Sequence, residues 1–148
     1  MKKIIVPILL LMSFNSFSFE YKGVKSGMTL EEVKAATGVS IEKITPTSYK
    51  MDYSAAGTWL PNLKPELSNV YLRFDHNGKL YYLLIEIDAP DEPIKAMGYV
   101  EAAKEVCDEV TVKTSDDRGG VNCIFVDGIL YRDTIKHYKE MQLKNLTT

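Results

Sequence analysis

The residues that could support histidine or metal chemistry are few. The chain has two histidines, His76 and His137, and neither has a zinc-ligand spacing such as H-x-x-x-H. A histidine acting as general base also needs a partner that positions it, and the sequence offers none. The simplest interpretation of His76 is a solvated residue in a hairpin turn. We therefore predict neither a metal site nor a catalytic histidine.

Two short motifs match known sites only in part. Ser40 and Lys43 have the S-x-x-K spacing of penicillin-recognising enzymes, but the S-D-N and K-T-G motifs of those enzymes are missing. Asp75, Asn77 and Gly78 match the start of a calcium-binding loop, but the later carboxylates of such a loop are absent. A hairpin turn accounts for these three residues. Neither motif predicts a site.

The acidic side chains suggest no catalytic pair either. Asp88, Asp91 and Glu92 fall in one expected loop, and Asp116 and Asp117 fall in another, where solvated charge is ordinary. No nucleophile, base and orienting group can be assembled from the sequence. We expect no enzyme activity and no cofactor, and a small hydrolase is kept only as an alternative.

The two cysteines, Cys107 and Cys123, are expected to form a disulfide bond. Such a pair persists in an oxidising compartment, and closing the loop between them stabilises a fold by about 3 kcal/mol. A redox-active or metal-binding pair is the alternative. The spacing is not C-x-x-C and no histidine is near in sequence, which favours the structural bond.

The first 18 residues have the three-part pattern of a secretory signal peptide. Lys2 and Lys3 precede an apolar run over 4–12, and the small residues Ser16 and Ser18 suit cleavage before Phe19. The run is too short to span a membrane, which needs ~20 residues. No cysteine near the cut could carry a lipid. We expect a soluble periplasmic or secreted protein without a transmembrane segment.

The remaining segment, 19–148, has the length of a single domain. The full chain has 18 basic and 20 acidic side chains without a run of like charge, so neither nucleic acid nor anionic lipid is suggested as a partner. Another envelope protein is the expected partner.

The pattern along this segment alternates helices and strands. Thr29 and Glu32 form a capping box for a short helix that ends at Gly38. A strand is expected at 48–54, where Tyr49 and Met51 share a face. Two further strands flanking Asn77-Gly78 form a β-hairpin. The first half therefore has one helix followed by three strands.

The second half repeats this order. We predict a helix over 94–106, strands across the loop at 116–120, and a strand over 129–138 that follows a tight turn at Asp127-Gly128. The expected fold class is α+β, with short helices packed on one face of an antiparallel sheet. Two αβββ units in tandem are possible.

Two groups of residues are candidates for binding a partner. In the second hairpin strand Tyr81, Leu83, Ile85 and Ile87 can face the core, which leaves Leu80, Tyr82 and Leu84 on the opposite face. Either a helix or extra strand covers that face or a partner does. Trp59 and Leu60 lie in a loop with Pro61 and Pro65, and they either project toward a partner or fill a gap in the core.

The stretch Gly27-Met28-Thr29-Leu30-Glu31-Glu32-Val33, with Gly38 after it and the later LRFDHNGKLYYL, resembles the small outer-membrane assembly lipoprotein family (SmpA/OmlA, also called BamE). The β-lactamase inhibitor proteins have a similar fold, with two such units in tandem. The lipid-bearing cysteine of the first family is missing here. The resemblance implies a periplasmic, non-catalytic protein-binding module of envelope-assembly or scaffold type. An inhibitor or immunity protein against a secreted hydrolase is the alternative.

Overall fold

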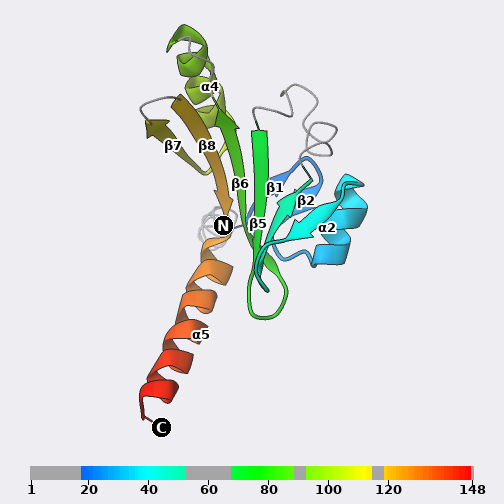
Figure 1. Ribbon diagram of the computed structural model, residues 1–148, viewed down its shortest axis with the longest axis vertical. Helices are drawn as coiled ribbons and strands as arrows, with labels where there is room; N and C mark the ends of the chain where they lie inside the picture. The colour runs from blue at the N-terminus through cyan, green and yellow to red at the C-terminus, as the bar shows by residue number, and fades with distance from the viewer. Residues whose placement is uncertain (1–17, 53–67, 89–92, 115–118, 148) are drawn as a thin grey trace, which may run out of the picture.

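A computed structural model of the chain describes residues 18–52, 68–88, 93–114 and 119–147 (Figure 1). In chain order the elements are β1 (Glu20–Tyr21), β2 (Val24–Lys25), α2 (Leu30–Thr37), β3 (Ile41–Lys43), β4 (Ser48–Met51), β5 (Ser68–Phe74), β6 (Leu80–Asp88), α4 (Pro93–Val106), β7 (Glu109–Thr114), β8 (Gly119–Val126) and α5 (Gly128–Thr147). The α+β class predicted from the sequence is confirmed.

Six of the strands form one antiparallel sheet in the order β3-β4-β5-β6-β8-β7. The long strand β6 lies in its middle, between β5 and β8. β1 and β2 form a separate small hairpin. Because neighbouring strands are antiparallel throughout, the side chains of each strand alternate between two faces of the same sheet. The two faces therefore have separate environments, which decide where each candidate residue lies.

The first helix, α2, has the capping that the sequence predicts. The Thr29 hydroxyl accepts a hydrogen bond from the Glu32 backbone N–H at 3.3 Å and donates to the Glu32 carboxylate at 3.3 Å. At the other end Gly38 has φ 68°, the left-handed conformation that glycine adopts without strain, and its N–H donates to the Lys34 carbonyl at 2.8 Å. Local sequence alone therefore defines both ends of this helix.

The hydrophobic core lies on one face of the sheet. α2 with the β1–β2 hairpin packs on the β4–β6 part of this face, and α4 packs on the part formed by β8 and β7. Apolar side chains of the sheet and of the elements that cover it are fully buried there: Val24, Val33, Met51, Val70, Leu72, Leu80, Leu83 and Val121. The expectation of helices packed on one face of the sheet is confirmed for α2 and α4.

The prediction of a strand over 129–138 is wrong, because these residues belong to the 20-residue helix α5. Asp127 does not open a turn between strands. Its carboxylate accepts hydrogen bonds from the N–H groups of Ile129 and Leu130, both at 3.1 Å, as a helix N-cap does. The second half of the chain thus has two strands and a helix after α4 rather than three strands. It does not complete a second αβββ unit.

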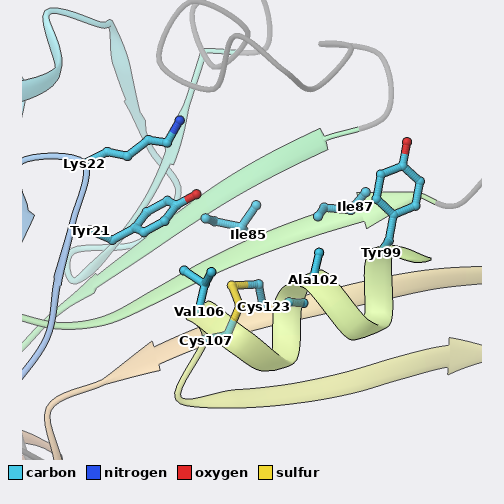
Figure 2. Close-up of a pocket in the computed structure, with 10 residues that line it drawn as sticks. Tyr21, Lys22, Ile85, Ile87, Tyr99, Ala102, Val106, Cys107 and Cys123 are labelled. Carbon is cyan, nitrogen blue, oxygen red and sulfur yellow. A yellow bond between two sulfur atoms is a disulfide. The ribbon is translucent and has the colours of Figure 1, made fainter. Parts of the chain in front are cut away.

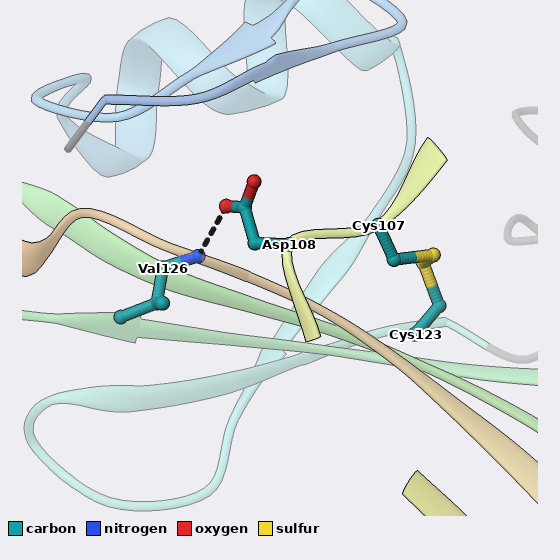
Figure 3. Close-up of a disulfide and its surroundings, with 4 residues drawn as sticks. All are labelled: Cys107, Asp108, Cys123 and Val126. Atoms are coloured by element: carbon teal, nitrogen blue, oxygen red, sulfur yellow. Dashed lines mark hydrogen bonds between the residues drawn. A yellow bond between two sulfur atoms is a disulfide. The ribbon is translucent and has the colours of Figure 1, made fainter. Parts of the chain in front are cut away.

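The predicted disulfide between Cys107 and Cys123 is present (Figure 3). Cys107 directly follows α4 and Cys123 lies in the middle of β8, so the bond fastens the end of the helix to the sheet. Next to it, the Asp108 carboxylate accepts a hydrogen bond from the Val126 N–H at 3.1 Å. Both contacts hold the α4–β7 connection against β8.

A β-bulge at the start of β6 changes the face on which Leu80 lies. Phe74 pairs with Leu80 while Arg73 pairs with Tyr82, so Tyr81 is the extra residue between these pairs. The extra residue puts Leu80 on the core face together with Leu83, and Leu80 is completely buried. Strict alternation predicted an outward Leu80, and the bulge is the reason that this prediction is wrong.

Replacing both cysteines by alanine should lower the free energy of unfolding by about 3 kcal/mol, because the bond closes a loop between positions 16 apart in sequence. Urea titration followed by circular dichroism of the oxidised and the double-variant proteins measures this. Reduced wild-type protein should unfold at the same urea concentration as the variant. Equal stability of the oxidised and reduced proteins would contradict a structural role.

Leu80→Ala should destabilise the fold by about 3 kcal/mol, the usual range for a fully buried leucine, because it leaves a cavity in the core. Leu84→Ala is the matched control on the same strand, since Leu84 lies half-buried on the opposite face. This substitution should lower the free energy of unfolding by less than half as much. Thermal unfolding of both variants gives the comparison. Similar losses would mean that the bulge is absent in solution.

Candidate functional site

The outer face of the sheet carries two of the candidate residues, Tyr82 and Leu84, both half-buried. Tyr82 lies next to Arg73 of β5, whose guanidinium carbon is 4.7 Å from the centre of the tyrosine ring. Leu84 pairs with Tyr71, and the Lys50 ammonium lies 5.7 Å from that ring. Cation–π contacts of this kind already engage much of the aromatic surface of this face. Of the other three candidates, Leu80 is buried in the core, and Trp59 and Leu60 lie outside the described residues.

A second outward-facing feature, which the sequence analysis missed, is the helix α5. It begins where β8 ends and runs away from the sheet and from both other helices (Figure 1). The Asp127 N–H donates a hydrogen bond to the Tyr81 carbonyl at 2.8 Å, and the Tyr131 ring lies 6.2 Å from the Tyr81 ring. The β6 bulge is thus the point at which the helix is attached.

One side of α5 rests against the β5–β6 hairpin. Thr134 is the only buried residue among those described in the helix, and its hydroxyl donates to the Leu130 carbonyl at 2.7 Å. Three residues further on, the His137 ring stacks on His76 of the hairpin turn, with ring centres 3.8 Å apart and planes 5° apart. These contacts fix the first half of α5 relative to the sheet.

An apolar row next to this contact is open to solvent, and we call it the α5 stripe. It consists of Tyr131, Ile135 and Tyr138, which recur at the four- and three-residue spacing that places side chains on one side of a helix, and of Leu146, two turns further along the same side beyond the polar Gln142. Ile135 is 50% exposed and Tyr138 is 42% exposed. A helix side of this composition is normally covered, so the α5 stripe is the best candidate for a binding surface.

Basic side chains border the α5 stripe on the side away from the hairpin. Arg132, Lys136 and Lys139 follow Tyr131, Ile135 and Tyr138 by one residue each, so they form a parallel row along the helix. The acidic residues Asp133 and Glu140 lie further round, away from the stripe. The exposed surface of α5 therefore combines an apolar centre with one positively charged border.

The structure gives Asp75 a role in the hairpin turn. Asp75, considered above as part of a calcium loop, is buried, and its carboxylate accepts hydrogen bonds from the N–H groups of Asn77 at 2.9 Å and Lys79 at 2.8 Å. It thereby closes the hairpin turn. Within the described part of the chain, no group of three or more His, Cys, Asp or Glu side chains is placed to hold a metal ion.

Two tyrosines at the junction of β6 and α5, Tyr81 and Tyr82, have shifted pKa values. Burial raises the pKa of Tyr81 and of Tyr82 above the ordinary value of 10.0, and Arg73 opposes the shift in both. Their hydroxyl groups thus remain protonated to higher pH in the native state than in the unfolded chain. Ionisation of either tyrosine therefore destabilises the native state relative to the unfolded chain.

A sequence signal for α5 was available. Tyr131, Ile135 and Tyr138 have the i, i+4, i+7 spacing of an amphipathic helix, and Asp127 is a residue that often caps helices. The Asp-Gly pair and the aromatic residues favoured a hairpin instead. Only the position of the helix, pointing away from the sheet, could not be inferred from that spacing.

Comparison with known proteins gives no match: neither a family model, nor a curated protein, nor a solved structure is matched by the chain. Among the residues that the structure describes, no helix is both long enough and apolar enough to cross a membrane. Function must therefore be argued from the α+β domain and its exposed helix.

Raising the pH should destabilise the protein through Tyr81 and Tyr82. Because their native pKa values are raised, the unfolded state loses these protons first, and stability falls as pH rises above 10.0 and through the native pKa values. Urea titrations across this range measure the slope. The Tyr81→Phe/Tyr82→Phe double variant should lose less stability at alkaline pH than the wild type. An identical pH slope in both proteins would refute the assignment.

Proposed function

We propose that this protein is a soluble, non-catalytic protein-binding module of the bacterial periplasm, of envelope-assembly or scaffold type, and that α5 is its docking element. The observation that carries the proposal is the α5 stripe: a helix fixed to the domain at one end presents tyrosine and isoleucine side chains to solvent. Tyrosine is enriched at the centres of protein interfaces.

Two features of the chain support the proposed location. The first 18 residues have the pattern of a cleavable signal peptide, and the disulfide between Cys107 and Cys123 suits an oxidising compartment. The resemblance of the first half of the domain to the outer-membrane assembly lipoproteins supports the same location.

The chemistry of α5 supports one kind of partner. Its apolar centre requires an apolar groove, and the row of Arg132, Lys136 and Lys139 requires acidic side chains along one border of that groove. A lipid surface fits less well, because Gln142 interrupts the apolar row and the polar side of α5 carries the acidic Asp133 and Glu140 as well as basic residues. The proposed partner is a protein with an acidic-rimmed groove.

A second copy of the chain is a poor partner for the α5 stripe. Pairing two α5 helices antiparallel about Tyr138 would place the basic row against itself, with Lys139 facing Lys139. Parallel pairing would need the opposite border, where Thr134 is buried and His137 is stacked on His76. We therefore propose association with a different protein.

Site-specific photo-crosslinking in intact cells tests this proposal. A photoreactive phenylalanine analogue at position 135, on the α5 stripe, should give one dominant adduct with an envelope protein. The same analogue at position 133, on the opposite side of the helix, should not give it. Equal adducts from both positions, or only a dimer of this chain, would contradict the proposal.

The identified partner then allows a quantitative test with purified proteins. Ile135→Asp should weaken binding at least tenfold, because it puts a charge in the apolar centre. Lys139→Glu should weaken it about fivefold at low salt and less at high salt. Glu140→Gln, which lies away from the stripe, is the control and should change little. A secreted hydrolase as the partner would make the protein an inhibitor instead of a scaffold.

A further inference from the structure

A separate cleft lies on the core side of the sheet, between the β1–β2 hairpin and α4 (Figure 2). Its floor is formed by Ile85 and Ile87 of β6, and α4 contributes Ala102 and Val106 to one wall. Tyr21 and Lys22 lie at one end of the cleft and Tyr99 lies at the other (Figure 2). The two layers that cover the sheet therefore leave an apolar gap where they approach one another.

The size of the cleft suits a short aliphatic chain. Its volume is about 230 Å³. An apolar cavity of about 150 Å³ holds a benzene ring, so the cleft has room for about eight or nine carbon atoms. The short side chain of Ala102 contributes to this space, because a larger residue at this point of α4 would project into it. A ligand with two acyl chains would not fit.

One end of the cleft adds a charge and a hydroxyl group. Lys22 is the one charged residue among the described side chains that line the cleft, and its ammonium lies 6.0 Å from the centre of the Tyr21 ring at the same end. Burial raises the pKa of Tyr21 above its ordinary value of 10.0, which favours the neutral hydroxyl. An apolar chain that ends in an anion is complementary to this arrangement.

Lys22 has a backbone conformation that is unusual for a lysine. It has φ 49° and Gly23 has φ 84°, so the two residues between paired Tyr21 and Val24 form the left-handed loop of a type I′ hairpin turn. Asparagine is the preferred residue at the first position of such a loop, and a lysine there is strained. A residue that served only the turn would be expected to be asparagine or glycine.

We propose that this cleft binds a free medium-chain fatty acid, with the aliphatic chain against Ile85 and Ile87 and the carboxylate at Lys22. The site is independent of α5, so it stands or falls separately from the proposed protein partner.

Isothermal titration calorimetry of the mature protein with decanoate, below its micelle concentration, tests the proposal. Decanoate should bind saturably at one site per chain. Decan-1-ol should bind about fivefold more weakly and decyltrimethylammonium more weakly still, because only the carboxylate is attracted to Lys22. Absence of saturable decanoate binding, or equal binding of the three probes, would overturn the proposal.

Two variants separate binding from folding. Lys22→Asn should weaken decanoate binding about fivefold and leave decan-1-ol binding unchanged, while the melting temperature stays the same or rises because the Asn-Gly turn is favoured. Ala102→Phe should fill the cleft and weaken both ligands at least tenfold. Glu105→Phe, on the same helix but outside the cleft, is its control. Unchanged decanoate affinity in Lys22→Asn or in Ala102→Phe would refute the site.

Discussion

Burial of one face of the central strand β6 is the constraint on which the rest of the structure depends. Leu80, Leu83 and Ile85 are almost completely removed from solvent, and both layers that cover the sheet meet over this strand. Because α2 and α4 lie on the same face, the described residues include no helix packed across the other one. The hydrophobic core that stabilises the domain therefore lies on the side of the sheet that α2 and α4 cover.

The bulge at Tyr81 links this core to the exposed helix. The extra residue lets Leu80 join the core, and it leaves the Tyr81 carbonyl free to accept a hydrogen bond from Asp127, the N-cap of α5. Bulges commonly redirect side chains near functional sites. Here one irregularity in a strand both completes the core and sets the starting point of α5.

The sequence predicted those features that depend on local chemistry or on covalent pairing. The capped helix ending at Gly38, the hairpin around Asn77-Gly78, the helix before Cys107 and the disulfide were all predicted, because each has its own local signal. The predictions failed where distant contacts decide. The bulge that buries Leu80 appears only when β5 and β6 pair, and Asp127 could begin either a turn or a helix. The role of Tyr82 and Leu84 in binding stays a prediction.

The central claim is that the α5 stripe is open in the isolated protein and covered by a partner in the periplasm. Hydroxyl-radical footprinting of purified mature protein and of protein in intact cells measures this directly at Tyr131, Ile135 and Tyr138. We predict strong labelling of these residues in the purified protein and clear protection in cells, with equal labelling of the exposed Met97 of α4 in both. Equal labelling of the stripe in the two samples would contradict the account.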